Sequence, residues 1–205
     1  MKKVTIVLLT ILLAGNSVMA QNSKTTKKST AKPSAAAATP EAEKPKKEIH
    51  WITDFNELQA KMQQEPKKVY IDMYTDWCGW CKKMDASTFS NPAVINYMNA
   101  NFYCVKFNAE RKDVIVFQGK EYKFEEQYKA NTLAVELIKG EMMYPTAVIM
   151  MENFQNPVPL KGYLDVPQLE TAVTYYGDNV YKHQNGQQYQ QTYKPTWAKS
   201  SGTSN

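Results

Sequence analysis

Cys78 and Cys81 are the residues best placed for chemistry, in the stretch 77–81 that reads WCGWC. This stretch lies where a predicted strand over residues 69–74 runs into a predicted helix. At the start of that helix, unpaired N–H groups and the positive end of the helix dipole stabilise the thiolate of Cys78. A thiolate of lowered pKa attacks a partner disulfide, and Cys81 then resolves the mixed disulfide. The pair therefore predicts thiol–disulfide exchange, with Cys78–Cys81 as its disulfide.

Two other interpretations of the pair remain open. The cysteines could supply half of a zinc site, which needs two further ligands. Cys104, His50 and His183 are the remaining candidates, and neither histidine stands at the spacing of a ligand. The pair could instead form a purely structural disulfide, although so short a loop restricts the unfolded chain little. We favour the redox pair, and we expect no metal because the remaining candidate ligands are poorly placed. We also expect no cofactor, because no nucleotide or flavin motif is present.

Residues 70–82, which read YIDMYTDWCGWCK, resemble the active-site segment of thioredoxin-fold proteins. They are especially similar to the secreted bacterial branch that includes the C-terminal domain of the periplasmic thiol-reductant transporters. The resemblance covers roughly residues 55–177. It implies an α/β thioredoxin fold, in which a mixed central sheet is flanked by helices on both faces. It also implies that the cysteine pair stands at the start of the first helix after the central strand.

The resemblance implies roles for three further positions. An acidic residue lies buried beneath the cysteines in the family, at the place of Asp72, and burial raises the pKa of such a carboxyl so that it can pass a proton. Lys106 is the implied partner of that carboxylate. Tyr144 and Pro145 stand where the family has a cis-proline that packs against the disulfide and pairs with the substrate chain. An Asp satisfied by hydrogen bonds at a sheet edge and a solvated Lys are the simpler alternatives.

The sequence departs from the family pattern at two places. Trp80 stands where reducing thioredoxins commonly have Pro, which leaves the direction of electron flow open. Trp77, Gly79 and Trp80, together with the two residues at the cis-proline position, are the predicted substrate-binding residues. Residues 111–143 are longer than the minimal family connection, and they could shape a partner groove or decorate the surface. A lone cysteine within a predicted strand, Cys104, is expected to behave as a small hydrophobic residue.

The elements around the motif alternate between helix and strand. We expect helices that begin near Asp54, Cys78, Asn91 and Asp165, each at a capping residue or at the motif itself. A fifth helix is expected over residues 131–139, ending at a glycine. Core strands are predicted at 69–74, 102–107 and 146–151, an edge strand at 158–162 and a small hairpin within 114–124. Strands that alternate with helices indicate a mixed α/β sheet with helices on both faces.

The charge of the chain is unevenly placed. Of 205 residues, 43% are apolar and 22% charged, with a formal net charge of +5. Residues 1–48 hold nine Lys and three Glu, so the remaining 157 residues hold 16 basic and 17 acidic groups. The folded part therefore lacks the basic excess of a nucleic-acid-binding face, and we expect no nucleic-acid partner.

The N-terminal segment predicts export. Two lysines, a short apolar run and small residues before Gln21 predict a cleavable signal peptide over residues 1–20, too short to span a bilayer. We expect no stable membrane insertion after cleavage and a periplasmic or extracellular location.

The composition of residues 21–48 predicts a disordered Lys/Ala/Pro-rich linker, and the thioredoxin-like domain is expected over residues 49–177. A Gln/Tyr-rich tail over 178–205 is expected to lack a fixed structure, because it has few periodic apolar residues.

These observations predict an exported thiol–disulfide oxidoreductase that acts on protein disulfides, more as a reductase or isomerase than as a strong oxidant. Its electrons would come from the dithiol of another protein. A client-binding or cofactor-delivery module with little turnover is the alternative, and a protein that holds a soft metal ion is a third.

Overall fold

The computed structural model describes residues 48–198. The predicted signal peptide and all but the last residue of the predicted linker lie outside the described residues.

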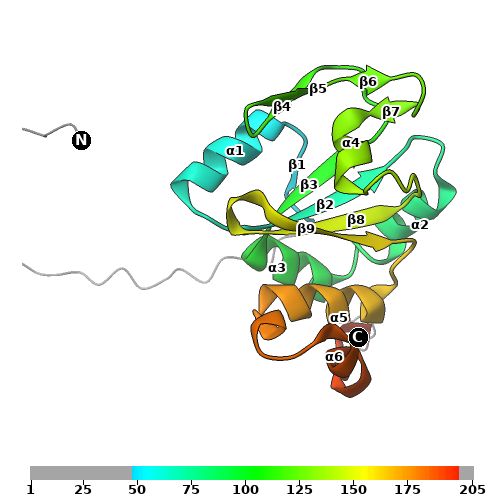
Figure 1. Cartoon of the computed structure of the whole chain (residues 1–205). Helices are drawn as coiled ribbons and strands as arrows, with labels where there is room; N and C mark the ends of the chain where they lie inside the picture. Colours follow the sequence, from blue (N-terminus) through cyan, green and yellow to red (C-terminus); the bar gives the residue numbers. More distant parts are fainter. Residues whose placement is uncertain (1–47, 199–205) are drawn as a thin grey trace, which may run out of the picture. The chain divides into compact units, whose positions relative to one another are not determined.

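The core of the fold is a five-stranded sheet with the order β1-β3-β2-β8-β9 (Figure 1). Its central strand, β2, pairs in parallel with β3 and antiparallel with β8. The outer pairs are β1 with β3, in parallel, and β9 with β8, antiparallel. The predicted mixed sheet is therefore confirmed. The strands are β1 (Trp51–Ile52), β2 (Lys68–Tyr74), β3 (Phe102–Asn108), β8 (Thr146–Met151) and β9 (Gln155–Lys161).

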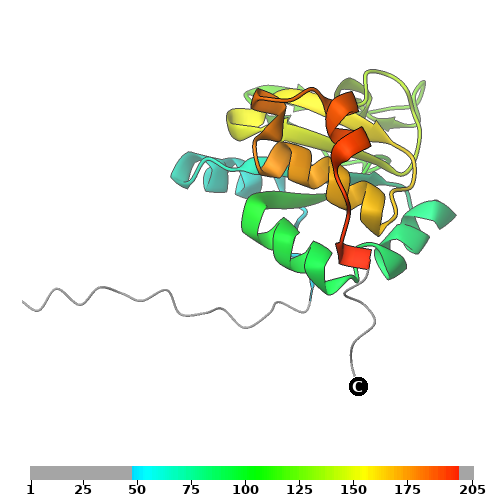
Figure 2. The ribbon, with the colours of Figure 1, turned by 90° about the horizontal axis from the view of Figure 1, so that it is seen from below.

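Helices cover both faces of this sheet, as predicted (Figures 1 and 2). Because successive strand residues point to opposite faces, the apolar run of β2 serves two separate cores. Val69, Ile71 and Met73 pack with α1 and α4, whereas Tyr70 packs with helices of the other face. The first face is covered by α1 (Phe55–Gln64) and α4 (Thr132–Leu137), and the second by α2 (Gly79–Ser87), α3 (Pro92–Asn101) and α5 (Val166–Gly177).

The predicted hairpin within residues 114–124 is present as β4 (Ile115–Phe117) and β5 (Lys120–Tyr122). Gln118 and Gly119 form its turn, with φ of 51° and 75°, the positive values that a two-residue hairpin favours. The hairpin buries Phe117 against α1. This part of the long 111–143 connection is therefore an extension of the core. A second short pair, β6 (Phe124–Glu125) and β7 (Ala130–Asn131), follows it.

The two edges of the sheet offer little for another chain to pair with. The β1 edge is only two residues long. The β9 edge carries Pro157 and Pro159, which have no backbone N–H to donate to a neighbouring strand.

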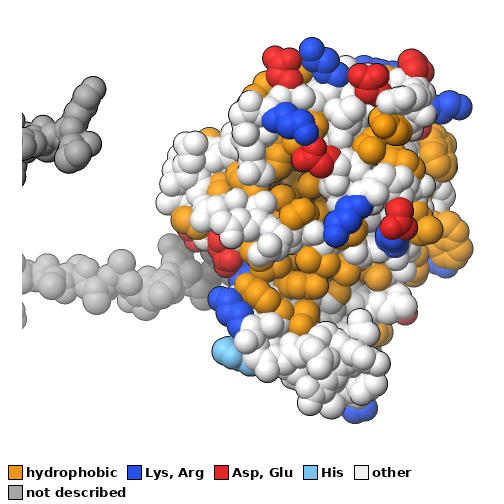
Figure 3. Space-filling model, in the orientation of Figure 1, with side chains coloured by type: hydrophobic (Ala, Val, Ile, Leu, Met, Phe, Trp, Pro, Cys, Tyr) orange, Lys and Arg blue, Asp and Glu red, His pale blue; other side chains and the backbone are white. Residues whose placement is uncertain are grey.

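Apolar side chains gather on either side of β9 on the face shown in Figure 3, while Lys, Arg, Asp and Glu are interspersed elsewhere on that face. No helix among residues 48–198 is both long and apolar enough to cross a bilayer.

The prediction that the tail lacks a fixed structure is wrong for its described part, residues 178–198. A 3-10 turn, η2 (Val180–Lys182), and a helix, α6 (Gly186–Thr192), follow α5. The fully buried carboxylate of Glu170 on α5 accepts hydrogen bonds from the backbone N–H groups of Thr196 and Trp197 and from the hydroxyl of Tyr193. Hydrogen bonds to one buried carboxylate and contacts between aromatic rings hold this segment in place. Neither kind of contact requires periodic apolar residues, so the sequence pattern did not predict the structure of the segment.

Candidate active site

Cys78 and Cys81 are joined by a disulfide at the start of α2. Cys78 is the N-cap of this helix, and its Sγ accepts a hydrogen bond from the backbone N–H of Cys81 at 3.1 Å. In the reduced protein the same N–H group and the helix dipole would favour a thiolate on Cys78. Both cysteines are buried, at 4% and 3% exposure.

The sheet topology brings the surroundings of the disulfide to one edge. Strands β2, β3 and β9 all run in the same direction, so their C-terminal ends lie at the edge where α2 begins. Strand β8 runs the other way and therefore starts at this edge, just after Pro145. The Tyr144–Pro145 bond is cis, as predicted, and Pro145 O accepts a hydrogen bond from Gly162 N at 2.9 Å. The carbonyl of Pro145 is thereby tied to the end of β9.

Two exposed indole rings flank the cysteines. Trp77 donates a hydrogen bond from Nε1 to the carboxylate of Glu110 at 2.9 Å, and its ring meets Tyr144 edge-on at 6.0 Å. Trp80 lies 5.4 Å from the ring of Tyr163. Gly79, between them, has open space where a Cβ would stand. The five predicted substrate-binding residues are thus brought to the same edge of the sheet.

Tyr144, beside the ring of Trp77, keeps its proton. Burial and the nearby carboxylate of Glu110 raise the pKa of Tyr144 to about 12. The residue therefore presents a neutral hydroxyl at physiological pH.

Asp72 and Lys106 face each other across β2 and β3. They are register partners, and Lys106 Nζ lies 2.6 Å from Asp72 Oδ2. The same ammonium contacts the carboxylate of Asp85, four residues after Cys81 on α2. Residues four apart share one face of a helix, so the three charged groups lie beneath the face of α2 that carries Cys81. Aromatic rings of Trp51, Tyr74 and Phe89 lie 5.1 to 5.4 Å from Nζ and complete its surroundings.

Burial and the contact between Asp72 and Lys106 shift the pKa of both groups. Burial raises the pKa of Asp72 above its ordinary value, and the charge of Lys106 limits that rise. Burial alone would lower the pKa of Lys106, but the two carboxylates outweigh it and raise the pKa. A carboxyl whose pKa is raised by burial is better suited to accept a proton from a buried thiol than an exposed one.

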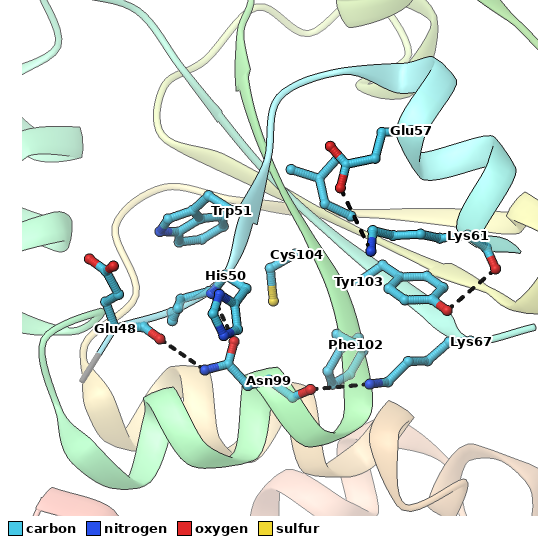
Figure 4. Close-up of a pocket in the computed structure, with 12 residues that line it drawn as sticks. Glu48, His50, Trp51, Glu57, Lys61, Lys67, Asn99, Phe102, Tyr103 and Cys104 are labelled. Carbon is cyan, nitrogen blue, oxygen red and sulfur yellow. Dashed lines mark hydrogen bonds and ion pairs between the residues drawn. The ribbon is translucent and has the colours of Figure 1, made fainter. Parts of the chain in front are cut away.

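A separate hollow lies beside β1, away from the disulfide (Figure 4). It encloses about 630 Å³, and neither Cys78 nor Cys81 lines it. Cys104 contributes its buried side chain to the wall, and burial raises the pKa of this thiol well above its ordinary value. Cys104 is therefore a neutral, packed residue. Among the described residues, no group of three or more His, Cys, Asp and Glu side chains could hold a metal ion.

Sequence reasoning missed three residues of the site. Asp85 could have been found, because it follows Cys81 at helical spacing. Glu110 and Tyr163 carry no comparable signal, because each reaches the exposed tryptophans Trp77 and Trp80 from the end of a different strand.

A five-stranded mixed sheet, a Cys-x-x-Cys disulfide at a helix N-terminus and a cis-proline at the same edge of the sheet define a thioredoxin-like protein. The family described as "Thioredox_DsbH: Protein of unknown function, DUF255" matches residues 39–176, more than half of the chain. The chain belongs to this family.

Relatives with assigned names match over shorter segments. The protein named Thiol:disulfide interchange protein DsbD from Campylobacter jejuni is 23% identical over 119 residues, which cover 58% of this chain and 18% of that protein. The DsbD of Pectobacterium atrosepticum is 35% identical over 48 residues, covering 23% of this chain and 8% of its own. This chain therefore spans less than a fifth of the length of these relatives.

Solved structures are similar at low identity. A thioredoxin-fold protein from Helicobacter pylori has a TM-score of 0.48 and 15% identity, covering 62% of this chain and 79% of its own. A structure titled DsbH Oxidoreductase has a TM-score of 0.45 and 17% identity, covering 64% of this chain and 85% of its own. The C-terminal domain of DsbD from Neisseria meningitidis has a TM-score of 0.37 and 22% identity, covering 63% and 99%.

Proposed function

We propose that this protein is an exported thiol–disulfide oxidoreductase that exchanges disulfides with other proteins through Cys78 and Cys81. The observation that carries the proposal is the position of the disulfide. It closes on the N-cap of α2, where a backbone N–H already points at Cys78 Sγ, and it lies at the same sheet edge as the cis-proline. The name of the DsbD relatives, Thiol:disulfide interchange protein, supports the same reaction class.

The first step is attack by the Cys78 thiolate on a client disulfide. A new S–S bond forms between Cys78 and one client sulfur, while the client S–S bond breaks and its second sulfur leaves as a thiolate. Cys78 is the better first nucleophile because its Sγ receives the N–H of Cys81 and lies at the positive end of the helix.

The second step is resolution by Cys81. This thiol must lose its proton before it attacks Cys78 Sγ, releases the second client thiolate and closes the Cys78–Cys81 disulfide. Asp72 is the proposed acceptor of that proton, because it is buried on the sheet face that α2 covers. Lys106 then positions the carboxylate and offsets its charge as the proton moves. A dithiol of another protein returns the disulfide to the reduced form.

We infer that the protein works as a reductase or isomerase rather than as a strong oxidant, in the periplasm or outside the cell. The export proposal rests on the signal-like sequence of residues 1–20. The direction of transfer is tested by the reduction potential of the Cys78/Cys81 pair, measured by equilibration in glutathione buffers. A potential close to that of glutaredoxins or thioredoxin, about −200 to −270 mV, supports a reductase or isomerase, and one near −120 mV a strong oxidant.

The reaction itself is tested by reduction of insulin disulfides with dithiothreitol as the electron donor. Wild-type protein should turn over, Cys78→Ser should be inactive, and Cys81→Ser should stop at a covalent mixed disulfide. Cys104→Ala is the matched control, because this cysteine is buried in another part of the sheet, and its activity should equal that of the wild type. Tight client binding without turnover would instead favour a client-binding module.

A further inference from the structure

Helix α2 carries two lysines at the end where a helix does not favour them. The N-terminus is the positive end of the helix dipole, so acidic side chains are stabilising there and basic ones are not. The first turn of α2 has no acidic residue, and Lys82 and Lys83 lie within the first five residues of the helix. In α1, by contrast, the first turn holds Glu57. The lysines of α2 therefore oppose the dipole of their own helix, but they add to the positive field around Cys78.

Aromatic rings hold the ammonium of Lys83 at this end of the helix. Its Nζ lies 4.6 Å from the centre of the Trp80 ring and 5.4 Å from the centre of the Tyr163 ring. These contacts are attractive, because the face of an aromatic ring carries partial negative charge. Helical side chains lean toward the N-terminus, so the lysine three residues after Trp80 reaches back over the indole that stands between the cysteines.

Hydrogen bonds fix the second ring against α2. Ser87 Oγ donates to the carbonyl of Lys83 at 2.7 Å and lies 3.0 Å from the hydroxyl of Tyr163. The next residue of the same loop, Leu164, accepts a hydrogen bond from Thr88 Oγ1 at 2.8 Å. The loop between β9 and α5 is thereby tied to the far end of α2. We call the four residues Trp80, Lys83, Ser87 and Tyr163 the α2 clasp.

Other charged groups near the cysteines do not favour a thiolate. Asp76 is exposed just before the cysteine motif, and Glu110 accepts the hydrogen bond of the adjacent indole, so both carboxylates oppose a negative charge on sulfur. The ammonium of Lys106 is shared by Asp72 and Asp85, which balance its charge. The ammonium of the α2 clasp contacts rings rather than a carboxylate, so its charge is left to act on the cysteine pair.

We propose that the α2 clasp holds Lys83 where its charge stabilises the thiolate of Cys78 and so shifts the cysteine pair toward its reduced form. The proposal rests on the proposed exchange function and deepens it, because it names a residue that biases the direction of electron transfer. It also gives a use to Trp80, which departs from the family pattern: the indole is the platform on which the cation rests. Lys83, Ser87 and Tyr163 are positioning residues that act through Cys78.

The test measures Cys78 itself. Its acid dissociation constant is read from the pH dependence of the iodoacetamide reaction of the reduced protein, and the redox equilibrium is read in glutathione buffers at pH 7. Lys83→Met should lower the dissociation constant about threefold and favour the disulfide form by about the same factor, the size of a typical interaction of an exposed charge. A threefold change is about 14 mV for this two-electron couple. Lys83→Arg should stay near the wild type, because a guanidinium also binds aromatic faces.

Lys82→Met is the matched control, because it removes the same charge from the neighbouring exposed residue of the same helix. Its shift should be less than half of that in Lys83→Met. Tyr163→Leu removes the second ring and should reproduce part of the Lys83→Met shift, whereas Tyr163→Phe keeps the ring and should reproduce less of it. The difference between the wild type and Lys83→Met should shrink in 1 M NaCl, where the screening length falls to about 3 Å.

Equal values for the wild type and Lys83→Met would overturn the proposal. Equal shifts in Lys82→Met and Lys83→Met would also overturn it, because they would show a general effect of surface charge without a part for the rings. A Lys83→Arg protein that behaves like Lys83→Met would do the same, since the charge would then not be the cause. None of these measurements needs a client, so failure of the wild type to reduce insulin would remove the exchange function alone, and the values for Cys78 would still decide this inference.

Discussion

Lys106 binds Asp72 and Asp85 at once, so one half-buried ammonium joins the central strand to the helix that carries the cysteines. Two carboxylates share a single positive charge in this arrangement. Because Asp72 is the more deeply buried of the two, it is the carboxyl whose pKa burial raises. The raised pKa of Asp72 favours uptake of a proton beneath α2, and single substitutions can test this role.

Asp72→Asn should separate the two steps of exchange. The amide keeps the shape of the side chain but cannot accept the proton of Cys81, so resolution should slow on the order of 10²-fold. Attack by Cys78 should change little, because its thiolate depends on the helix terminus. Stopped-flow reduction of a disulfide peptide, with acid-trapped intermediates, should show mixed disulfides accumulating through Cys78. Unchanged resolution would make Asp72 a structural residue.

The stability of Asp72→Asn relative to the wild type should depend on pH. The pKa of Asp72 is raised from its ordinary value of 3.8, so the folded state binds its proton more tightly than the unfolded state does. Wild-type stability is therefore reduced as pH rises from about 4 through the raised pKa, whereas the amide has no such loss. Urea unfolding between pH 3 and 8 should show the variant gaining on the wild type as pH rises. The opposite trend would mean that Lys106 outweighs burial.

Asp85→Asn should shift the pH profile of resolution without removing the proton acceptor. The charge of Asp85 helps to raise the pKa of Asp72, so its loss should lower that pKa and move the midpoint of the profile to lower pH. Asp113→Asn removes a carboxylate that pairs with Arg111 on the inserted segment and should not move the midpoint. A profile that is identical in all three proteins would remove Asp85 from the mechanism.

Cys78 alone should react with iodoacetamide in the reduced native protein near pH 6. Its Sγ is stabilised by the helix terminus, whereas Cys81 lies one turn inside the helix and burial raises the pKa of Cys104. Peptide mass spectrometry after short labelling identifies the modified residue. Equal labelling of Cys78 and Cys81 would reverse the assignment of the attacking thiol.

Truncation after residue 192 should destabilise the domain, contrary to the expectation from the sequence of the tail. It removes the N–H and hydroxyl donors of Tyr193, Thr196 and Trp197 from the buried carboxylate of Glu170. A buried charge left without its donors costs on the order of 3 kcal/mol of unfolding free energy. Truncation after residue 198 keeps these donors and serves as the control in urea unfolding. Equal midpoints for the two truncated proteins would show that the docked segment contributes nothing.

The sequence by itself determined the core strands, the helices α1 to α5 and the reactive pair, but not β1, the β6–β7 pair or α6. The apolar run of β2, the capping residues Asp54, Asn91 and Asp165 and the hairpin turn act over a few residues, so each element could be predicted from its own segment. The cysteine spacing also acts locally, because the first turn of α2 brings Cys78 and Cys81 together. The cis bond at Pro145 followed from the family resemblance rather than from local preference.

Only the tertiary structure decided how distant segments meet. The family resemblance implied the pair of Asp72 and Lys106, but the contact of Lys106 with Asp85 exists only because α2 packs over β3 beside β2. Glu170 binds Thr196 across 26 residues of a Gln- and Tyr-rich segment without apolar periodicity. Such contacts depend on the match between one buried polar group and a few backbone donors, and this match exists only after the helices have packed.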